Sequence, residues 1–216
     1  MNDALDEATY TRYLEALLAG DRASCSRMVA GLMAVGIDLK VLYLDLFQRA
    51  LYEVGERWAS QQISVAVEHL ATAITERVMA DVHASAFKGS RRNQSMVVAC
   101  VADEYHQLGA RMIADFCEMR GWRGHFLGAN TPLPDLLQVL ATKRPTMLGL
   151  SLSIHTNLPR LLAAVEAVEH AHPDLPILVG GQALRWGDVS ALDRSPNVSR
   201  IESLDQLDAT LGAYEH

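Results

Sequence analysis

The sequence predicts an α/β protein in which an N-terminal four-helix bundle precedes a doubly wound domain with a parallel, Rossmann or flavodoxin-like sheet. Two observations predict this fold class. Up to about residue 88, apolar residues recur at spacings of three and four, which is typical of amphipathic helices. Beyond residue 95, short apolar runs alternate with helical patterns, as in βαβ units. The change of rhythm predicts a helical domain at 1–88, a linker at 89–95 and a second domain at 96–216.

Four helical patterns make up the first domain, and short breaks separate them. Their ranges are about 8–18, 22–34, 38–58 and 62–87. The breaks fall at Gly20-Asp21, at Gly36 and at Ser60-Gln61, and glycine in particular disfavours a helix interior. Because the connections are short, consecutive helices are expected to pack as antiparallel neighbours in a bundle.

Five short apolar runs predict the strands of the second domain. They read MVVACVA, RGHFLGA, TMLGLSLS, PILVGG and NVSRIES. Helical patterns lie between or after them at about 107–120, 133–143, 157–171 and 203–213. A helix between two strands returns the chain to the starting edge of the sheet, so this alternation favours a parallel sheet.

The charge of the chain argues against direct nucleic-acid binding. The formal net charge is −7, whereas nucleic-acid binders concentrate Lys and Arg in a basic patch. The basic cluster from Lys88 to Arg92 lies beside Gly, Ser, Asn and Gln residues, which favours a solvated linker over a phosphate contact.

The cysteines and the N-terminus indicate a soluble, cytoplasmic protein with reduced thiols. Cys25, Cys100 and Cys117 are widely spaced and form no Cys-x-x-Cys pair, which argues against disulfides and a structural zinc. The N-terminus MNDALDEATY is acidic, unlike a signal peptide, and no segment approaches the roughly 20 apolar residues of a membrane span. No membrane association is expected.

Side chains with chemical functions follow three of the predicted strands. They are Glu104 and His106 after the first, Ser151 and Ser153 at the third, and the pair Gly180-Gly181 at the fourth. The carboxyl ends of parallel strands meet at one edge of a sheet, and open α/β sheets bind ligands there. Glycine lets a large planar or phosphate-bearing ligand approach the backbone closely. A single histidine or glycine pair is more often ordinary packing, but the combination predicts a ligand site.

Three common site motifs are absent from the sequence. No Gly-x-Gly-x-x-Gly follows the first strand, and neither Gly-x-x-x-x-Gly-Lys-Ser/Thr nor Gly-x-Ser-x-Gly occurs. Dinucleotide, P-loop nucleotide and α/β-hydrolase sites therefore lack their principal sequence support.

The spacing of these residues resembles the signature of cobalamin-binding domains. Residues 104–109, EYHQLG, match Asp/Glu-x-His-x-x-Gly, Ser151 begins the Ser-x-Leu element, and Gly180-Gly181 match the final Gly-Gly. The resemblance implies that His106 is the lower axial ligand of cobalt and replaces the dimethylbenzimidazole tail, which is buried near Ser151 and the glycines. Ser153 departs from the pattern, because the signature has Leu there.

The chemistry of these side chains agrees with the implied roles. An imidazole nitrogen is a suitable ligand for a transition metal, and a carboxylate two residues away can orient the imidazole from behind. A serine hydroxyl can hydrogen-bond a ring nitrogen of the tail. We therefore expect cobalamin contacts from Glu104, His106, Gly109, Ser151, Ser153, Gly180 and Gly181, with His106 as the metal ligand.

The helical domain carries a second resemblance. Trp58, nine intervening residues and Glu68-His69 resemble the Trp-x9-Glu-His motif in the helical cap of light-sensing cobalamin regulators of the CarH type. The resemblance implies that Trp58, Glu68 and His69 cover the upper axial ligand, typically a deoxyadenosyl group. It also implies that the region 1–88 forms a cap over the upper face of the corrin ring.

Two departures from those regulators affect the expected function. Ala59 stands where the related photoreceptors have a histidine that captures the cobalt after light removes the adenosyl group. His69, His125, His155 and water remain as alternatives for that role. The MerR-type DNA-binding domain that precedes the helical cap in those regulators has no counterpart in this sequence, so direct DNA binding is not expected.

The leading hypothesis is a stand-alone sensor that binds adenosylcobalamin in the base-off, His-on form, with hydroxocobalamin and methylcobalamin as alternatives. Light or cobalamin status would act on a protein partner such as a transcription regulator, as in antirepressors of the AerR kind, or on a homo-oligomer. The alternative is a corrinoid methyl carrier, an enzyme subunit of a methyltransferase system. The motif at Trp58 and Glu68-His69 suits a large upper ligand and favours a binding protein over an enzyme.

Overall fold

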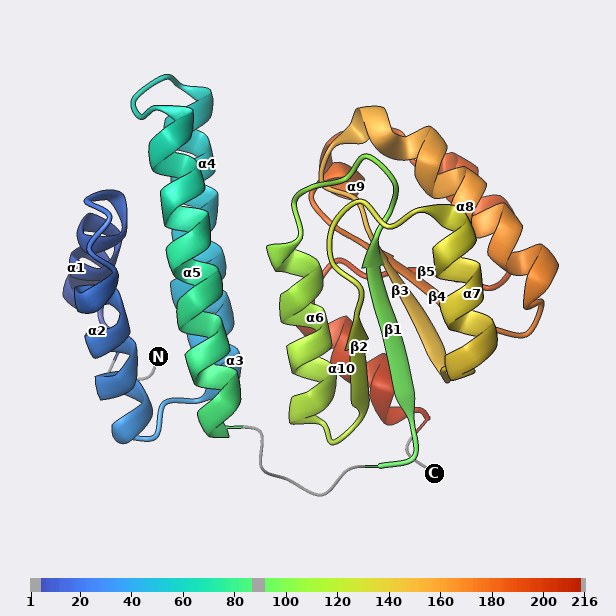
Figure 1. Ribbon diagram of the computed structural model, residues 1–216, viewed down its shortest axis with the longest axis horizontal. Coiled ribbons are helices and arrows are strands. Elements are labelled where there is room, and N and C mark those ends of the chain that lie inside the picture. Colours follow the sequence, from blue (N-terminus) through green and yellow to red (C-terminus); the bar gives the residue numbers. More distant parts are fainter. Residues whose placement is uncertain (1–4, 87–91, 215–216) are drawn as a thin grey trace. The chain divides into compact units, whose positions relative to one another are not determined.

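The computed structural model describes residues 5–86 and 92–214 and divides the chain into two compact units, Met1–Lys88 and Gly89–His216 (Figure 1). The predicted linker at 89–95 and the basic cluster from Lys88 to Arg92 lie partly outside the described residues. In the part of the chain that is described, no helix is both long enough and apolar enough to span a bilayer.

The first unit consists of four helical rods within its described residues, as the sequence predicts. They are α1 (Glu7–Leu18), α2 (Arg22–Ala34), the continuous rod of α3 (Leu39–Val41), the π-helical η1 (Leu42–Gln48) and α4 (Arg49–Ala59), and α5 (Val65–Ala86). Three rods begin at an aspartate whose side chain accepts a hydrogen bond from a backbone N–H of the first turn: Asp6, Asp21 and Asp38. These caps satisfy donors that a helix start leaves unpaired.

Packing of aromatic and aliphatic side chains stabilises this helical unit. The rings of Tyr43 and Phe47 meet edge to face with centroids 5.5 Å apart. Burial of each such side chain contributes roughly 1.5–3 kcal/mol. The fully buried residues include Tyr13, Leu17, Leu42, Leu46 and Phe47.

The second unit is built on a five-stranded, all-parallel sheet with the strand order β2-β1-β3-β4-β5. The strands are β1 (Ser95–Cys100), β2 (Arg123–Phe126), β3 (Met147–Ser151), β4 (Ile177–Gly180) and β5 (Val198–Arg200). Every residue of β1 and β3 is buried, which explains why the sequence shows continuous apolar runs there and not an alternating pattern. The strand order is that of flavodoxin-like sheets and confirms the predicted doubly wound class.

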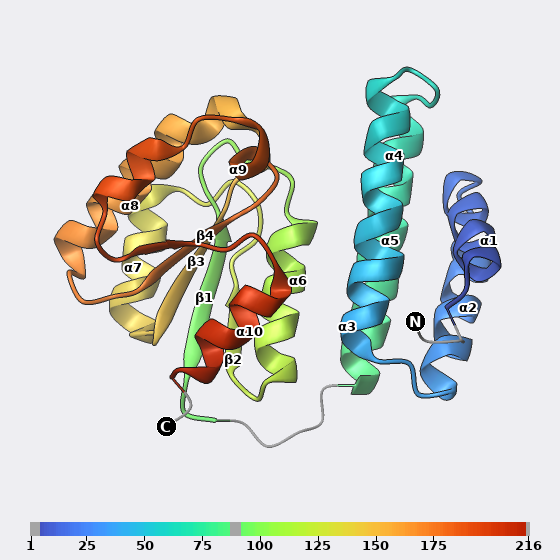
Figure 2. The same cartoon turned by 180° about the vertical axis from the view of Figure 1, so that it is seen from behind.

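Helices cover both faces of this sheet. The four longer ones are α6 (Leu108–Met119), α7 (Leu133–Lys143), α8 (Leu158–Ala171) and α10 (Leu204–Gly212). The two opposite views show α6 and α10 on one face and α7 and α8 on the other (Figures 1 and 2). The core between the sheet and α7 and α8 includes Val97, Leu148, Leu150, Leu161 and Val165.

The topological switch point of the sheet lies between β1 and β3. These two strands are hydrogen-bonded neighbours, yet the chain leaves β1 toward α6 and leaves β3 toward α8, on opposite faces. The two connections therefore diverge at the carboxyl edge, which is the usual place for ligands in this class of fold.

Candidate functional site

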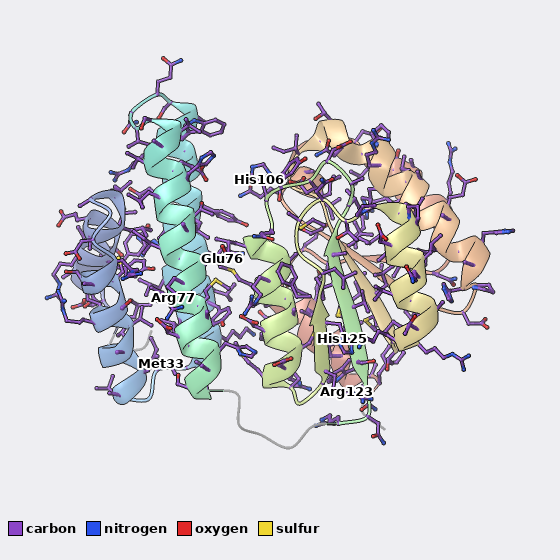
Figure 3. All side chains as sticks on the ribbon, in the orientation of Figure 1. Met33, Glu76, Arg77, His106, Arg123 and His125 are labelled. Carbon is purple, nitrogen blue, oxygen red and sulfur yellow. The ribbon has the colours of Figure 1, made fainter. Side chains whose placement is uncertain are left out.

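The ends of β1, β3 and β4 meet at the carboxyl edge of the sheet. Cys100, the last residue of β1, is paired with Ser151, and Ser151 is paired with Gly180. Glu104 and His106 follow in the loop from β1 to α6, where Figure 3 labels His106. The structure therefore brings the sequence-predicted residues of three strand ends together at one edge.

Glu104 holds this edge together. Its side chain is fully buried and its two oxygens accept four hydrogen bonds. Oε1 accepts from the backbone N–H of His106 at 2.9 Å and from the ring Nδ1 of His106 at 2.6 Å. Oε2 accepts from the backbone N–H groups of Ser153 at 2.9 Å and Ile154 at 3.0 Å. One carboxylate thus connects the loop after β1 to the loop after β3.

These donors keep Glu104 ionised. Burial alone would raise the pKa of Glu104, but the hydrogen bonds from His106, Ile154 and Ser153 outweigh it and lower the pKa to about 2. An ionised carboxylate accepts hydrogen bonds and cannot donate, so the proton between the two side chains resides on Nδ1 of His106.

This proton fixes the tautomer of His106. In a neutral imidazole with its proton on Nδ1, the lone pair lies on Nε2, and Nε2 is then the nitrogen that can bind a metal. The side chain is 57% exposed, so a ligand at the sheet edge can reach it. A histidine that binds a metal through one ring nitrogen usually donates the N–H of the other to a group such as a carboxylate, which orients the ring in this way.

Cys100 lies close to His106 but is poorly suited to bind a metal. Burial, and secondarily the charge of Glu104, raises the pKa of Cys100 to about 12. The thiol therefore stays protonated at neutral pH, whereas the thiolate is the form that binds metals. Its Sγ lies 3.8 Å from the carbonyl oxygen of His106, to which the thiol donates weakly.

In the helical unit, the residues of the second motif lie on both sides of one turn. Trp58 is in the last turn of α4, is 48% exposed, and its carbonyl oxygen accepts from the N–H of Gln61. Glu68 and His69 are in the first turns of α5. Oε1 of Glu68 accepts from the hydroxyl of Thr72 at 3.0 Å, and Oε2 lies 3.6 Å from Nε2 of His69. The exposed indole of Trp58 and the hydrogen-bonded carboxylate of Glu68 therefore belong to the two helix ends that the turn from α4 to α5 connects.

Two family models match the chain, and both are described as B12 binding domain. One matches residues 94–193 and the other matches residues 9–81, so together they cover well over half of the chain. The chain belongs to the B12-binding-domain proteins. Cobalamin binding is the activity that both matches support, and the site at the carboxyl edge lies within the first of them.

A curated relative of this B12-binding chain is the HTH-type transcriptional repressor CarH of Myxococcus xanthus. It is 30% identical over 174 residues, which are 80% of this chain and 57% of CarH. The chain thus spans just over half the length of that relative.

Solved corrinoid proteins share the B12-binding fold. The monomethylamine corrinoid protein of Methanosarcina barkeri superposes with a TM-score of 0.75 at 11% identity. The superposition covers 94% of this chain and 96% of the corrinoid protein. The methanol:cobalamin methyltransferase complex MtaBC from Methanosarcina barkeri gives a TM-score of 0.52 at 12% identity, with coverages of 97% and 80%. At such low identity these structures establish the fold alone.

The apolar surroundings of His106 fit a large, flat B12 ligand. Tyr105, between Glu104 and His106, is 66% exposed, and Ile154, in the loop after β3, is 42% exposed. Large apolar side chains at such exposure around a polar group are typical of ligand surfaces. In the sequence, the signal for these two residues is an apolar residue between polar ones, which does not distinguish them.

The packing of the chain itself requires a glycine at position 181 but not at position 109. A Cβ on Gly181 would collide with the backbone of Leu152, and its φ of 119° is rarely adopted by other residues. The chain needs this glycine with or without a ligand. Among the described residues, a Cβ on Gly109 would meet no atom within 4 Å outside its chain neighbours and the backbone of its own helix, so packing there does not require a glycine.

The histidines considered for the upper ligand lie in different places. His125 is within β2, paired with Val97, and Figure 3 labels it along the sheet away from His106. His155 follows β3 at the same carboxyl edge as His106, and its Nε2 lies 3.2 Å from the carbonyl oxygen of Asp188. Ala59 is the exposed last residue of α4.

Proposed function

We propose that this chain is a cobalamin-binding sensor that binds adenosylcobalamin with the nucleotide tail displaced and with His106 as the lower cobalt ligand. Light or cobalamin status then changes a contact with a protein partner, such as a transcription regulator, or between copies of the chain. The observation that carries the proposal is the exposed imidazole of His106, whose tautomer is fixed by the buried, ionised Glu104.

The residues of each unit have distinct parts in this proposal. Nε2 of His106 would bind the cobalt from the lower side of the corrin ring, and Glu104 holds the imidazole in place through Nδ1. Ser151 and Gly180 flank the displaced tail, and Tyr105 and Ile154 exclude water from the ring edge. Trp58, Glu68 and His69 contact the upper ligand. The bound cobalamin supplies a cobalt–carbon bond that light or methyl transfer can break.

The second candidate is a methyl carrier that serves methyltransferases. The fold likeness to the monomethylamine corrinoid protein favours it, but this likeness concerns the architecture alone. Homology to the repressor CarH favours the sensor, and so does the exposed indole of Trp58, at the end of α4 that leads to Glu68 in the first turn of α5. A methyl group is small and gives an indole and a carboxylate little to contact.

Illumination of the reconstituted protein separates these two functions. The protein is loaded in the dark with adenosylcobalamin, desalted, and examined by absorption and size-exclusion chromatography before and after green light. The sensor predicts retained cofactor and light-dependent changes in both the spectrum and the elution volume. A spectrum that changes while the elution volume stays constant would favour the carrier or a sensor of another input over a light-dependent oligomer, and failure to retain any cobalamin would contradict both functions.

Replacement of Trp58 by alanine tests the upper-ligand contact. Loss of aromatic stacking on an adenine costs about 1–3 kcal/mol, so we expect roughly tenfold weaker binding of adenosylcobalamin. Hydroxocobalamin lacks the adenine, and its affinity should change little. Val35→Ala is the matched control, because Val35 is also a strongly exposed apolar residue of the helical unit. Equal losses for the two cobalamins would show that Trp58 only packs within the protein.

Replacement of Gly109 by alanine tests the lower-face contact. Because a Cβ there meets no atom of another part of the described chain within 4 Å and alanine favours helices, the apoprotein should be unchanged or up to about 1 kcal/mol more stable. An added methyl group against a closely packed ligand costs about 1–3 kcal/mol, which corresponds to cobalamin binding that is roughly 5-fold to 150-fold weaker. Gly31→Ala is the control, since Gly31 also lies in a helix with no atom near its Cβ. Unchanged affinity in Gly109→Ala would remove Gly109 from the site.

A further inference from the structure

Asp103 has an unusual backbone conformation for its residue type. Its φ is 66°, in the left-handed region that favours glycine, and it directly precedes Glu104. Aspartate tolerates this region better than most residues but still at some cost, so the conformation persists only where neighbouring groups hold it. The backbone of Asp103 sets the direction in which the chain enters the stretch from Glu104 to His106.

Groups from two other loops hold Asp103 in this conformation. Its N–H donates to Oδ1 of Asn130, in the loop after β2, at 2.8 Å. Its carbonyl oxygen accepts from Nδ2 of Asn157 at 3.0 Å, and its Oδ2 accepts from Nε of Arg160 at 2.9 Å. Both of these residues lie in the segment that leads from β3 into α8.

Asn130 binds the next residue as well. Its own N–H donates to the carbonyl oxygen of Glu104 at 2.8 Å, and its φ is 47°. The loops after β1, β2 and β3 therefore meet at the dipeptide Asp103-Glu104. The side chain of Glu104 faces His106, whereas these contacts fix the backbone that carries it.

We infer that Asp103 is a positioning residue for the metal-binding imidazole of His106, with Asn130, Asn157 and Arg160 as the groups that hold it. The inference rests on the proposed lower-ligand role of His106. Asp103 and Arg160 have side chains that are 54% and 62% exposed, and an ion pair so exposed stabilises a fold very little. Loss of the network should therefore affect the orientation of His106 more than the folding of the chain.

Asp103→Ala, Asp103→Asn and Asn130→Gly test the inference. Alanine disfavours the left-handed region and has no carboxylate, whereas asparagine tolerates the region and offers an oxygen to Arg160. Glycine at position 130 keeps the backbone conformation and the N–H to Glu104 but removes the acceptor for Asp103. The control is Arg144→Ala, because Arg144 also has a positive φ, of 46°, but lies at the end of α7, before β3.

The readouts are hydroxocobalamin affinity, the nitrogen splitting in the paramagnetic resonance spectrum of the reduced cobalt, and thermal unfolding of the apoprotein. We expect Asp103→Ala and Asn130→Gly to bind hydroxocobalamin about tenfold more weakly, a loss that is usual when a partner of a metal ligand is removed. Both variants should also lose part of the splitting that comes from histidine. Asp103→Asn should keep both the affinity and the splitting close to those of the wild-type protein. Arg144→Ala should unfold at a lower temperature but keep the wild-type spectrum.

The outcomes separate this inference from the proposed function. If wild-type protein shows no splitting from histidine, the proposed lower-ligand role fails. If wild-type protein shows it and both Asp103→Ala and Asn130→Gly keep wild-type affinity and splitting, the positioning role of Asp103 is wrong. If Asp103→Ala does not fold, Asn130→Gly alone decides, since its backbone conformation is preserved.

Discussion

Glu104→Ala is expected to destabilise the apoprotein by roughly 3–5 kcal/mol and to abolish ligation by His106, because it removes a buried charge on which four N–H groups converge. The backbone donors of His106, Ser153 and Ile154 would lose their acceptor. The two loops that the carboxylate connects would separate. Chemical denaturation of the apoprotein and the spectrum of bound cobalamin measure the two effects.

The same carboxylate predicts an acid-dependent loss of stability. The pKa of Glu104 is lowered from 4.5 to about 2 in the folded protein, so its contribution is fully present above pH 4.5 and is lost as the pH falls toward 2. A shift of this size corresponds to about 3 kcal/mol. Glu104→Gln should remove this part of the pH dependence, since an amide does not titrate. Parallel pH profiles for wild-type protein and Glu104→Gln would contradict the role of Glu104 as an ionised acceptor.

Glu104→Asp is the conservative control. A shorter carboxylate keeps the charge but cannot reach the donors of both loops equally well, so stability and ligation should fall between those of wild-type protein and Glu104→Ala. If Glu104→Ala were as stable as wild-type protein, the buried hydrogen bonds would not be the groups that join the loops after β1 and β3.

His106→Ala is expected to affect cobalamin binding more than the stability of the apoprotein. The side chain is more than half exposed, so the apoprotein should lose no more than about 1.5–3 kcal/mol, the contribution of one hydrogen bond to a charged group. Loss of a metal ligand should weaken cobalamin binding by at least about tenfold, since removal of a mere partner of such a ligand already has this effect. Titration followed by absorption measures both the affinity and the changed spectrum.

His155→Ala provides the matched control for this variant. His155 lies at the same carboxyl edge and is also exposed, but its Nε2 faces the carbonyl oxygen of Asp188. Its replacement should leave the lower-face spectrum unchanged. If His155→Ala changed the spectrum and His106→Ala did not, the assignment of the lower ligand would have to move to the loop after β3.

The periodic parts of the fold were predictable from the sequence. The helices at 22–34 and 133–143 were predicted at the bounds that the structure has, because apolar spacing reports directly which face of a helix packs. The strands were predicted as continuous apolar runs, since both faces of the sheet are covered. Their ends were placed one to three residues too far, because apolar residues continue past the last strand hydrogen bonds.

Elements that depend on tertiary contacts were not predictable. The π-helical segment Leu42–Gln48 has the same apolar spacing as its flanking α-helical turns. The one-turn helix α9 (Ala183–Trp186) and the short η2 (His155–Asn157) are set by the loops around them and not by a repeating pattern. Segments of this length have too few residues to show a period.

The candidate site was predictable only in its side chains of distinctive type. The spacing of Glu104 and His106 led to the expectation that the carboxylate orients the imidazole, and the hydrogen bond of 2.6 Å agrees with it. The second half of the arrangement uses the backbone N–H groups of Ser153 and Ile154, which any residue provides. The conformation of Asp103 likewise follows from contacts of Asn130 and Arg160, which no local pattern reveals.

The central claim is that a histidine of the protein, His106, replaces the cobalamin tail at cobalt. The most direct measurement is the paramagnetic resonance spectrum of reduced cobalamin bound to protein in which the histidine rings carry heavy nitrogen. The account predicts that the nitrogen splitting changes when the protein is labelled and that this effect of the label disappears in His106→Ala. A splitting that is the same in labelled and unlabelled protein would show that the cobalamin tail keeps its place on the metal and would contradict the account.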